Sequence, residues 1–195
     1  MLVADRKTPL VEVELKVFID ESTYGRLLKE FSRLGKLIED TRQITHYLDH
    51  PMDTRVQISR DGGKIAQKTG WVHDEARHEL EIKMSRTQAK DALKIFKNIG
   101  IGPKISWFRH RLAYQISRIN VMLDNTVGYG MILEPEIMAP KDEIAESKDR
   151  LKNFLFELGL APSPKDVFEK AFREYSLQWR ERTQGLDESW LDEGE

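Results

Sequence analysis

The sequence contains no cysteine among its 195 residues. Disulfide bonds, thiolate nucleophiles and cysteine-based zinc sites are therefore excluded, and any bound metal must use carboxylate or histidine ligands. The 5 histidines are scattered along the chain without a metal-ligand spacing. Because carboxylate oxygens suit hard ions, the class of metal expected here is Mg²⁺, Mn²⁺ or Ca²⁺.

The chain also lacks a long apolar run and an excess of charge of one sign. No stretch approaches the ~20 apolar residues of a membrane span, and the N-terminal MLVADRKTPL does not resemble a signal peptide, so a cytoplasmic protein is the default expectation. The formal net charge is -2, which argues against a general polyanion binder. Any site for a charged ligand must therefore be local, with both signs of charge gathered in one place.

Alternation and helical spacing along the chain predict an α+β protein. Segments in which apolar and polar residues alternate predict strands, joined in one case by a DGG hairpin turn at 61–63; these segments are 10–18, 43–49, 54–60, 64–71, 77–84, 104–115, 118–125 and 131–137. Apolar residues at helical spacing predict helices over 21–35, 85–100, 141–159 and 164–182. We expect one domain over residues 1–182 and an acidic, flexible C-terminal tail over 183–195.

The polar faces of the predicted strands carry an unusual number of charges. Side chains two residues apart share a face, so the first strand places Glu12, Glu14 and Lys16 together, opposite a row of apolar residues. The same sorting gives further charged faces with Arg55, Lys64 with Lys68, Glu79 with Glu81, Arg109 with Arg111, Asp124, and Glu134 with Glu136. For any one strand, a solvated face of an antiparallel sheet explains the pattern.

Two features of the set favour a different explanation. Carboxylates pair at i and i+2 three times, which is repulsive unless something compensates, and the helices need the apolar strand faces as a packing surface. If the sheet closes into a barrel of about eight strands, its charged faces line an interior that can enclose a small ligand. Such an interior is costly unless a divalent metal satisfies the acids and a polyphosphate satisfies the bases.

The motifs also resemble a known family. The stretch Glu12 to Lys16 is similar to the Glu-x-Glu-x-Lys signature of the CYTH superfamily, also called the triphosphate tunnel metalloenzymes. Later blocks follow in the family's order and extend the resemblance over about residues 9 to 180: Tyr47 with Asp49, TRVQISRDGGKIAQKTG, RHELEIKM, FRHRLAY, LDNTVGYG and ILEPEI. The superfamily includes class IV adenylate cyclases, thiamine triphosphatases and inorganic tripolyphosphatases.

This resemblance implies a closed, eight-stranded antiparallel tunnel with helices on the outside, and it assigns roles to the charged residues. The acids implied to bind Mg²⁺ or Mn²⁺ are Glu12, Glu14 and Glu136, with Asp124 and Glu134 at a second metal or the attacking water. The cations implied to grip the triphosphate are Lys16, Arg55, Lys68, Arg109 and Arg111, to which we add Lys64. The predicted catalytic set is Asp124, Glu134 and Lys16.

The sequence departs from the family pattern at three positions, of which Tyr129 in place of a usual Leu is a minor one. Gln57 stands where a second arginine is usual, which leaves open whether Arg55 or Gln57 occupies the arginine position. Pro135, between Glu134 and Glu136, removes a donor from the strand ladder and predicts a bulge or an opening there.

Three functions remain open from the sequence. The first is a metal-dependent triphosphatase acting on tripolyphosphate, thiamine triphosphate or a nucleoside triphosphate, and the second is an adenylate cyclase. The third is a non-catalytic polyphosphate- or nucleotide-binding module. The expected partner is a small triphosphate, with nucleic acid limited to a 5′-triphosphate RNA end, no membrane, and a monomeric or homodimeric chain. Trp107, Trp179 and Trp190 are assigned to packing or tail contacts.

Overall fold

The computed structural model describes residues 10–68 and 79–193, and within these ranges one antiparallel sheet is surrounded by four α-helices. The strands are β1 (Leu10–Glu14), β2 (Val17–Ile19), β3 (Lys36–Leu48), β4 (Asp53–Ser59), β5 (Gly63–Lys68), β6 (Glu79–Met84), β7 (Pro103–Ile116), β8 (Ile119–Thr126) and β9 (Gly130–Pro140). The helices are α1 (Glu21–Leu34), α2 (Arg86–Asn98), α3 (Ile144–Glu157) and α4 (Lys165–Arg182), with 3-10 turns η1 (Lys141–Glu143) and η2 (Glu188–Asp192).

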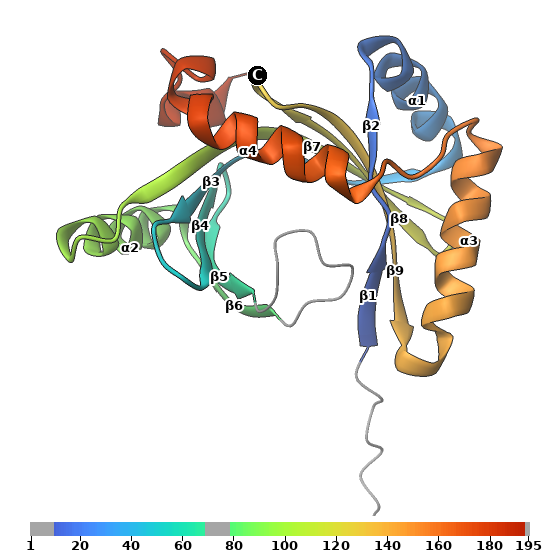
Figure 1. The fold of residues 1–195 in the computed structure, drawn as a ribbon, viewed down its shortest axis with the longest axis horizontal. Helices are drawn as coiled ribbons and strands as arrows, with labels where there is room; N and C mark the ends of the chain where they lie inside the picture. The colour runs from blue at the N-terminus through green and yellow to red at the C-terminus, as the bar shows by residue number, and fades with distance from the viewer. Residues whose placement is uncertain (1–9, 69–78, 194–195) are drawn as a thin grey trace, which may run out of the picture.

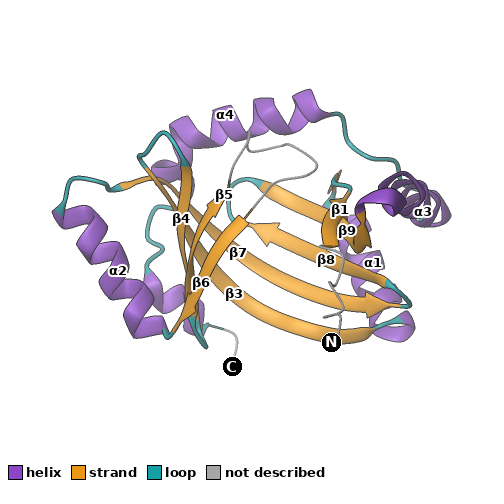
Figure 2. Cartoon of the chain, turned by 90° about the horizontal axis from the view of Figure 1, so that it is seen from below, coloured by secondary structure: helices purple, strands orange, loops and turns teal. Residues whose placement is uncertain are grey.

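The strand order across the sheet is β1-β9-β8-β7-β3-β4-β5-β6, and β2 continues the line of β1 along β9. The long strands β3 and β7 pair over most of their length and form the middle of the sheet. The sheet curls strongly, and its edge strands β1 and β6 lie apart on the two sides of its concave face (Figure 2). This curl turns one face of every strand towards a common interior.

The expected closed barrel is wrong for the described residues, since the sheet is open between its edge strands β1 and β6. Closure would require these two strands to pair along their length. Glu12 and Glu14 on β1 and Glu81 on β6 line the interior, and like charges placed opposite one another destabilise a strand pair. The α+β class and the antiparallel arrangement are confirmed, while the sheet is a curled half-barrel.

The first predicted strand is interrupted opposite Pro135. Pairing of β1 with β9 stops at Glu14 and Glu136, and pairing of β2 with β9 resumes at Val17 and Leu133. Between them the backbone N–H of Leu15 donates to the carbonyl oxygen of Pro135 at 3.1 Å. The predicted opening at this proline is therefore present, because a residue without an N–H cannot continue the ladder.

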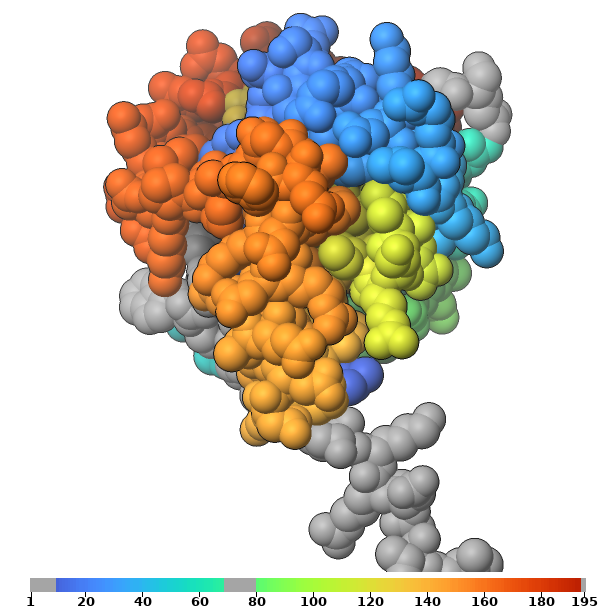
Figure 3. Space-filling view, turned by 90° about the vertical axis from the view of Figure 1, so that its right-hand side faces the viewer, coloured from blue at the N-terminus to red at the C-terminus, as the bar shows by residue number. Residues whose placement is uncertain are grey.

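The apolar strand faces hold the helices, as the alternation predicts. Val13, Leu15 and Val17 are buried in a core that also contains Leu27 of α1 and Leu151 of α3. Figure 3 shows α1 and α3 side by side over this outer face. α1 begins after the N-cap Asp20, whose carboxylate accepts the backbone N–H of Thr23 at 2.7 Å.

A second core lies under α2, on the outer face of β3 and β4. α2 begins after the N-cap Ser85, which forms a reciprocal capping box with Gln88. Trp190 and Leu191 of η2 are buried in this core, and Arg86 of α2 forms an ion pair with Asp192 at 2.7 Å. The described part of residues 183–195 is therefore packed, in contrast to the expected flexible tail, because its apolar residues find a partner surface distant in sequence.

Several strand ends differ from the predicted ones. β3 begins at Lys36, seven residues before the expected start at Gln43, and a register shift between Leu37 and Glu39 interrupts its alternation. The expected extension of the fourth strand to residue 71 and the start of the fifth at 77 lie outside the described residues. None of the described helices combines the length and apolar character needed to cross a membrane.

Candidate functional site

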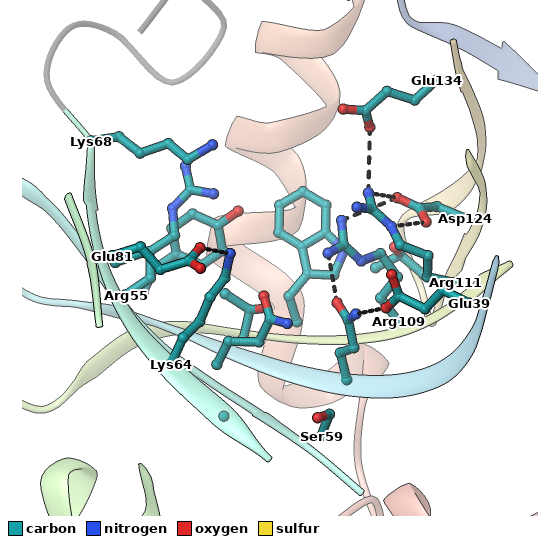
Figure 4. Close-up of a pocket in the computed structure, with 18 of the residues that line it drawn as sticks. Glu39, Arg55, Ser59, Lys64, Lys68, Glu81, Arg109, Arg111, Asp124 and Glu134 are labelled. Atoms are coloured by element: carbon teal, nitrogen blue, oxygen red, sulfur yellow. Dashed lines mark hydrogen bonds and ion pairs between the residues drawn. The ribbon is translucent and has the colours of Figure 1, made fainter. Parts of the chain in front are cut away.

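The inner face of the curled sheet surrounds a cavity of about 1090 Å³. All residues predicted to form the site line this one cavity: Glu12, Glu14, Lys16, Arg55, Lys64, Lys68, Arg109, Arg111, Asp124, Glu134 and Glu136. Figure 4 shows labelled members of the set extending towards the same space from opposite sides of the sheet. The strands therefore place the side chains as the alternation predicts, although the barrel is open.

One side of the cavity is an acid wall, formed by Glu12 and Glu14 of β1 and Glu134 and Glu136 of β9. Glu14 and Glu136 are register partners, so the carboxylates of the two strands crowd together. Burial, with the adjacent charge of Glu134, raises the pKa of Glu14 from 4.5 to about 8. Burial, with a hydrogen bond to and the charge of Glu12, raises the pKa of Glu136 to about 7. Near neutral pH this wall therefore holds protons that a cation would displace.

Lys16 lies next to this wall and compensates part of its charge. Its ammonium contacts Glu14 and lies 3.7 Å from Glu134. Burial alone would lower the pKa of Lys16, but the carboxylates of Glu134 and Glu14 outweigh burial and raise it. Burial alone would raise the pKa of Glu134, but Lys16 and Arg111 lower it well below its usual range. One lysine does not neutralise four carboxylates, so the wall keeps an excess of acid.

The donor set of the acid wall fits a hard divalent metal. Its ligands are carboxylate oxygens from adjacent strands, the type that Mg²⁺ and Mn²⁺ prefer. Within the described ranges, no three such side chains are already gathered around one point as a finished metal site. The acids instead interact in two pairs, Glu12 with Glu136 and Glu14 with Glu134. A metal at this wall would relieve the repulsion within the pairs.

The centre of the cavity is occupied by two arginines of β7 held on one carboxylate of β8. Arg111 donates from Nε and Nη2 to Asp124, both at 2.7 Å, and Arg109 donates from Nη1 at 3.0 Å. Asp124 is 2% exposed. The register pairs Arg111 with Asp124, so the bidentate contact follows directly from strand alignment.

These contacts favour a positioning role for Asp124 in place of the expected role at a second metal or the attacking water. Three of its acceptor positions are already used by arginine N–H groups, so the carboxylate holds Arg109 and Arg111 in place. Arg111 also lies 3.6 Å from Glu134, which links this central group to the acid wall. Burial and the neighbouring Arg111 lower the pKa of Arg109, while Asp124 opposes that shift.

The opposite side of the cavity, on β4 and β5, carries Arg55, Lys64 and Lys68, which we call the basic wall. Arg55 forms a two-point ion pair with Asp53 at 2.7 and 2.8 Å, and its guanidinium lies 4.4 Å over the ring of Tyr47. Lys64 contacts Glu81. Arg55 and Gln57 both line the cavity, so Arg55 faces inward and Gln57 adds a neutral amide.

The sequence-based set omitted two polar residues of β3 that line the cavity. Gln43 is 5% exposed, and its Nε2 donates to Glu39 at 2.8 Å. Its Oε1 accepts from Nη2 of Arg109 at 2.8 Å. The alternation of Gln43, Thr45 and Tyr47 was a usable signal for this face. The sequence offered no such signal for Glu39, because this residue lies in the part of β3 that was not predicted as a strand.

Comparisons with known proteins establish the fold. No family model and no curated protein matches the sequence. The solved structure of PH1012 protein from Pyrococcus horikoshii OT3 matches with a TM-score of 0.66 and 21% identity, covering 79% of this chain and 95% of that one. A protein from Vibrio parahaemolyticus named "putative adenylate cyclase" matches with a TM-score of 0.62 and 16% identity, covering 82% and 98%.

A third solved structure carries a description of activity. HpAC1 from Hippeastrum is named "putative adenylyl cyclase" and is described as revealing a dominant triphosphatase activity; it matches with a TM-score of 0.60 and 16% identity. The match covers 85% of this chain and 95% of that one. The fold of this chain is therefore shared with proteins named for cyclase and triphosphatase chemistry.

Proposed function

We propose that the protein belongs to the CYTH superfamily and is a divalent-metal-dependent triphosphatase acting inside the curled sheet. One observation carries this proposal: a single cavity has an acid wall on β1 and β9 and cations on β4, β5 and β7 facing it. A metal and a polyphosphate are the pair of ligands that such a division of charge fits.

The acid wall would hold the metal through Glu12, Glu14 and Glu136. When bound there, a divalent ion supplies charge neutralisation to phosphate oxygens and orients the phosphate chain. The carboxylates that would bind the ion lie on β1 and β9, and the pairing of these two strands fixes their positions relative to each other. The raised pKa values of Glu14 and Glu136 support the assignment, since Lys16 contacts Glu14 and approaches Glu134 but does not compensate the charge of the whole acid wall.

The cations would bind the phosphate chain. Arg109 and Arg111 are already held in position by Asp124, so they lose little freedom when they donate to phosphate oxygens. Lys16 lies 3.7 Å from Glu134, and Arg111 lies 3.6 Å from the same carboxylate, so the lysine and the central pair meet at Glu134. The basic wall would take the remaining oxygens from the other side.

Hydrolysis needs a water aimed at the phosphorus, and Glu134 is the residue that fits this task. Its lowered pKa keeps the carboxylate ionised, so it can accept a hydrogen bond from the attacking water. Asp124 contributes indirectly, by fixing the two arginines. Lys16 and Arg111 next to Glu134 would stabilise the charge that develops as the P–O anhydride bond breaks.

Cyclisation of ATP is the second candidate, favoured by the names of the structural neighbours from Vibrio parahaemolyticus and Hippeastrum. The deciding experiment incubates the protein with tripolyphosphate, thiamine triphosphate, ATP, GTP and 5′-triphosphate RNA, each with Mg²⁺ or Mn²⁺. Release of phosphate that depends on metal is expected. Formation of cyclic AMP and pyrophosphate from ATP would show that the protein is a cyclase and not a hydrolase. If no substrate is turned over, the protein would instead be a binding module.

A further inference from the structure

One end of the cavity is aromatic, unlike its charged middle. Tyr47 of β3, Trp107 of β7, Tyr129 of the β8–β9 turn and Phe168 of α4 line it, and we call these four residues the aromatic wall. The ring centroids of Trp107 and Tyr129 are 4.5 Å apart, and those of Trp107 and Tyr47 are 5.7 Å apart. A phosphate chain gains nothing from such a surface, so this wall needs a different ligand group.

The aromatic wall directly adjoins the cations proposed to hold phosphate. Trp107 precedes Arg109 by two residues on β7 and shares its face, so their Cα atoms are about 7 Å apart. Tyr47 is the register partner of Arg55, whose guanidinium covers its ring. A ligand gripped by these cations would therefore bring an attached group against the rings.

Trp107 has an unused polar group. Its Nε1 is buried and has no hydrogen-bond partner among the described residues. Buried donors without an acceptor are rare in folded proteins and call for an explanation. The edge of a heteroaromatic ring carries nitrogen or oxygen acceptors, the kind of group that this donor lacks.

The rings of the wall are backed by α4, which crosses this end of the sheet (Figure 1). Phe172 and Tyr175 of α4 lie 5.9 and 5.4 Å from Trp107, measured between ring centroids. The hydroxyl of Tyr175 donates to the carbonyl oxygen of Ser106 at 2.9 Å, which fixes α4 to β7. These contacts with α4 hold the indole of Trp107 in place, and Trp107 also lines the cavity.

The size of the cavity agrees with a larger ligand than a bare phosphate chain. Its volume of about 1090 Å³ reaches the upper end of the range of roughly 300–1,000 Å³ for sites that hold drug-sized molecules. A triphosphate with a planar ring system would use both the charged middle and the aromatic end. Inorganic tripolyphosphate would leave the aromatic end without a ligand.

We propose that the aromatic wall binds a planar heteroaromatic group carried by an organic triphosphate, with Trp107 as its main stacking surface. The inference rests on the proposed function, because that function places the phosphates on the neighbouring cations. Two sources share this chemistry, a nucleobase and the ring system of thiamine. The proposal also revises the assignment of Trp107 to packing alone.

The test compares Trp107→Leu with Phe172→Leu, a control that removes a ring from the α4 side of the cluster. Phe172 contacts Trp107 and is not among the described residues that line the cavity. Calorimetry measures the affinity for ATP, thiamine triphosphate and tripolyphosphate, and phosphate release is followed in parallel. Trp107→Leu is expected to weaken binding of ATP or thiamine triphosphate on the order of tenfold, and that of tripolyphosphate by less than about twofold.

A second variant guards against loss of folding. Trp107→Phe keeps an aromatic ring and removes the Nε1–H, so it is expected to retain most of the affinity that Trp107→Leu loses. The inference is overturned if Trp107→Leu weakens all three ligands equally, or if Phe172→Leu matches its selective effect. If Trp107→Leu does not fold, the wild type and Trp107→Phe are compared instead. The inference then fails if both proteins bind ATP and thiamine triphosphate no more tightly than tripolyphosphate. Absence of turnover with a selective loss of ATP binding would overturn the proposed hydrolase and leave the aromatic site in place.

Discussion

The two sides of the cavity differ in how their charges are satisfied. On the acid wall, Lys16 contacts Glu14, but Glu14 and Glu136 also crowd other carboxylates and have raised pKa values. On the basic wall, Arg55 is chelated by Asp53 and Lys64 contacts Glu81, so each has a partner within the protein. The comparison indicates that the acid wall is the side that most needs an external ion.

The centre resembles neither side. Arg109 and Arg111 are fixed on the buried Asp124, and Gln43 and Glu39 extend the network across β3. These hydrogen-bonded groups hold their geometry before a ligand arrives, while Nε of Arg109 has no hydrogen-bond partner among the described residues. The cavity therefore combines a preorganised phosphate-binding centre with a metal side that is incompletely compensated.

The largest effect is expected from Asp124→Asn, which disrupts the centre. Removing one partner of a buried ion pair leaves charge uncompensated and costs about 3–5 kcal/mol of unfolding free energy. Asp124 faces two such partners, and both arginine side chains are less than a quarter exposed. Urea denaturation measures the loss, and tripolyphosphate should restore part of it because its anionic oxygens replace the carboxylate.

The control for this variant is Asp149→Asn, which breaks an exposed ion pair with Lys152. It should change the unfolding free energy by less than about 1 kcal/mol. If Asp124→Asn were equally mild, Asp124 would not be the anchor of the arginines.

The next largest effect is expected on catalysis, from Glu14→Gln on the acid wall. The amide cannot replace a carboxylate as a metal ligand or as a negative charge, so kcat/KM should fall by about 10²–10³-fold. Phosphate release with Mg²⁺ measures it, and the folded state is checked by circular dichroism. Glu146→Gln, on the exposed side of α3, is the matched control and should leave activity unchanged.

Glu12→Gln tests the second carboxylate pair of the acid wall, Glu12 with Glu136. It is expected to lose activity as Glu14→Gln does while keeping the fold. Full activity in both variants would remove the metal from the acid wall.

A smaller effect is expected in the pH dependence of stability of the metal-free protein. Glu14 has a folded-state pKa of about 8 against an ordinary 4.5, so the folded protein holds more protons than the unfolded chain between these values. Stability therefore falls as pH rises towards 8, on the order of 1 kcal/mol per pH unit for such a group. Glu136 adds to this fall up to about pH 7.

The pH range in which this fall in stability can be measured begins at pH 6.5. Burial, with the nearby Lys97, lowers the pKa of His46 from 6.5 to about 4, and this shift makes stability rise with pH below 6.5. Urea denaturation between pH 6.5 and 8 should show the fall, and Glu14→Gln should flatten it. A stability that rises with pH across this window would contradict the assignment.

The smallest effect is expected from Gln43→Leu. The substitution leaves Arg109 and Glu39 without the amide that joins them, which costs about 1–2 kcal/mol. We expect kcat/KM to fall by about tenfold through misplacement of Arg109, with Gln43→Glu restoring the acceptor that Arg109 uses. Equal kinetics for Gln43→Leu and the wild type would show that Asp124 alone positions the arginine.

Much of the fold and of the site could be predicted because strand alternation is a local property. Glu12, Glu14 and Lys16 face inward and Val13 and Leu15 face the helices, as the period of two requires. The same rule placed Arg109 with Arg111 and Glu134 with Glu136. Which residues share the cavity was thus available from the sequence.

The features that were missed depend on contacts between distant segments. Closure of the sheet depends on the two edge strands, and the pattern within each strand does not report whether they pair. Trp190 was assigned to packing or a tail contact, but the surface under α2 on which it packs is distant in sequence and was not predicted. Glu39 was missed because the register shift in β3 interrupts the alternation that would have indicated its inward orientation.

The most direct test of a metal side facing a phosphate side is a calorimetric titration of the protein with tripolyphosphate at pH 8, with and without Mg²⁺. Mg²⁺ should increase the affinity of the wild type by about tenfold or more, and it should not do so in Glu14→Gln. The same affinity with and without Mg²⁺, or the same gain in Glu14→Gln, would contradict a metal held by the acid wall.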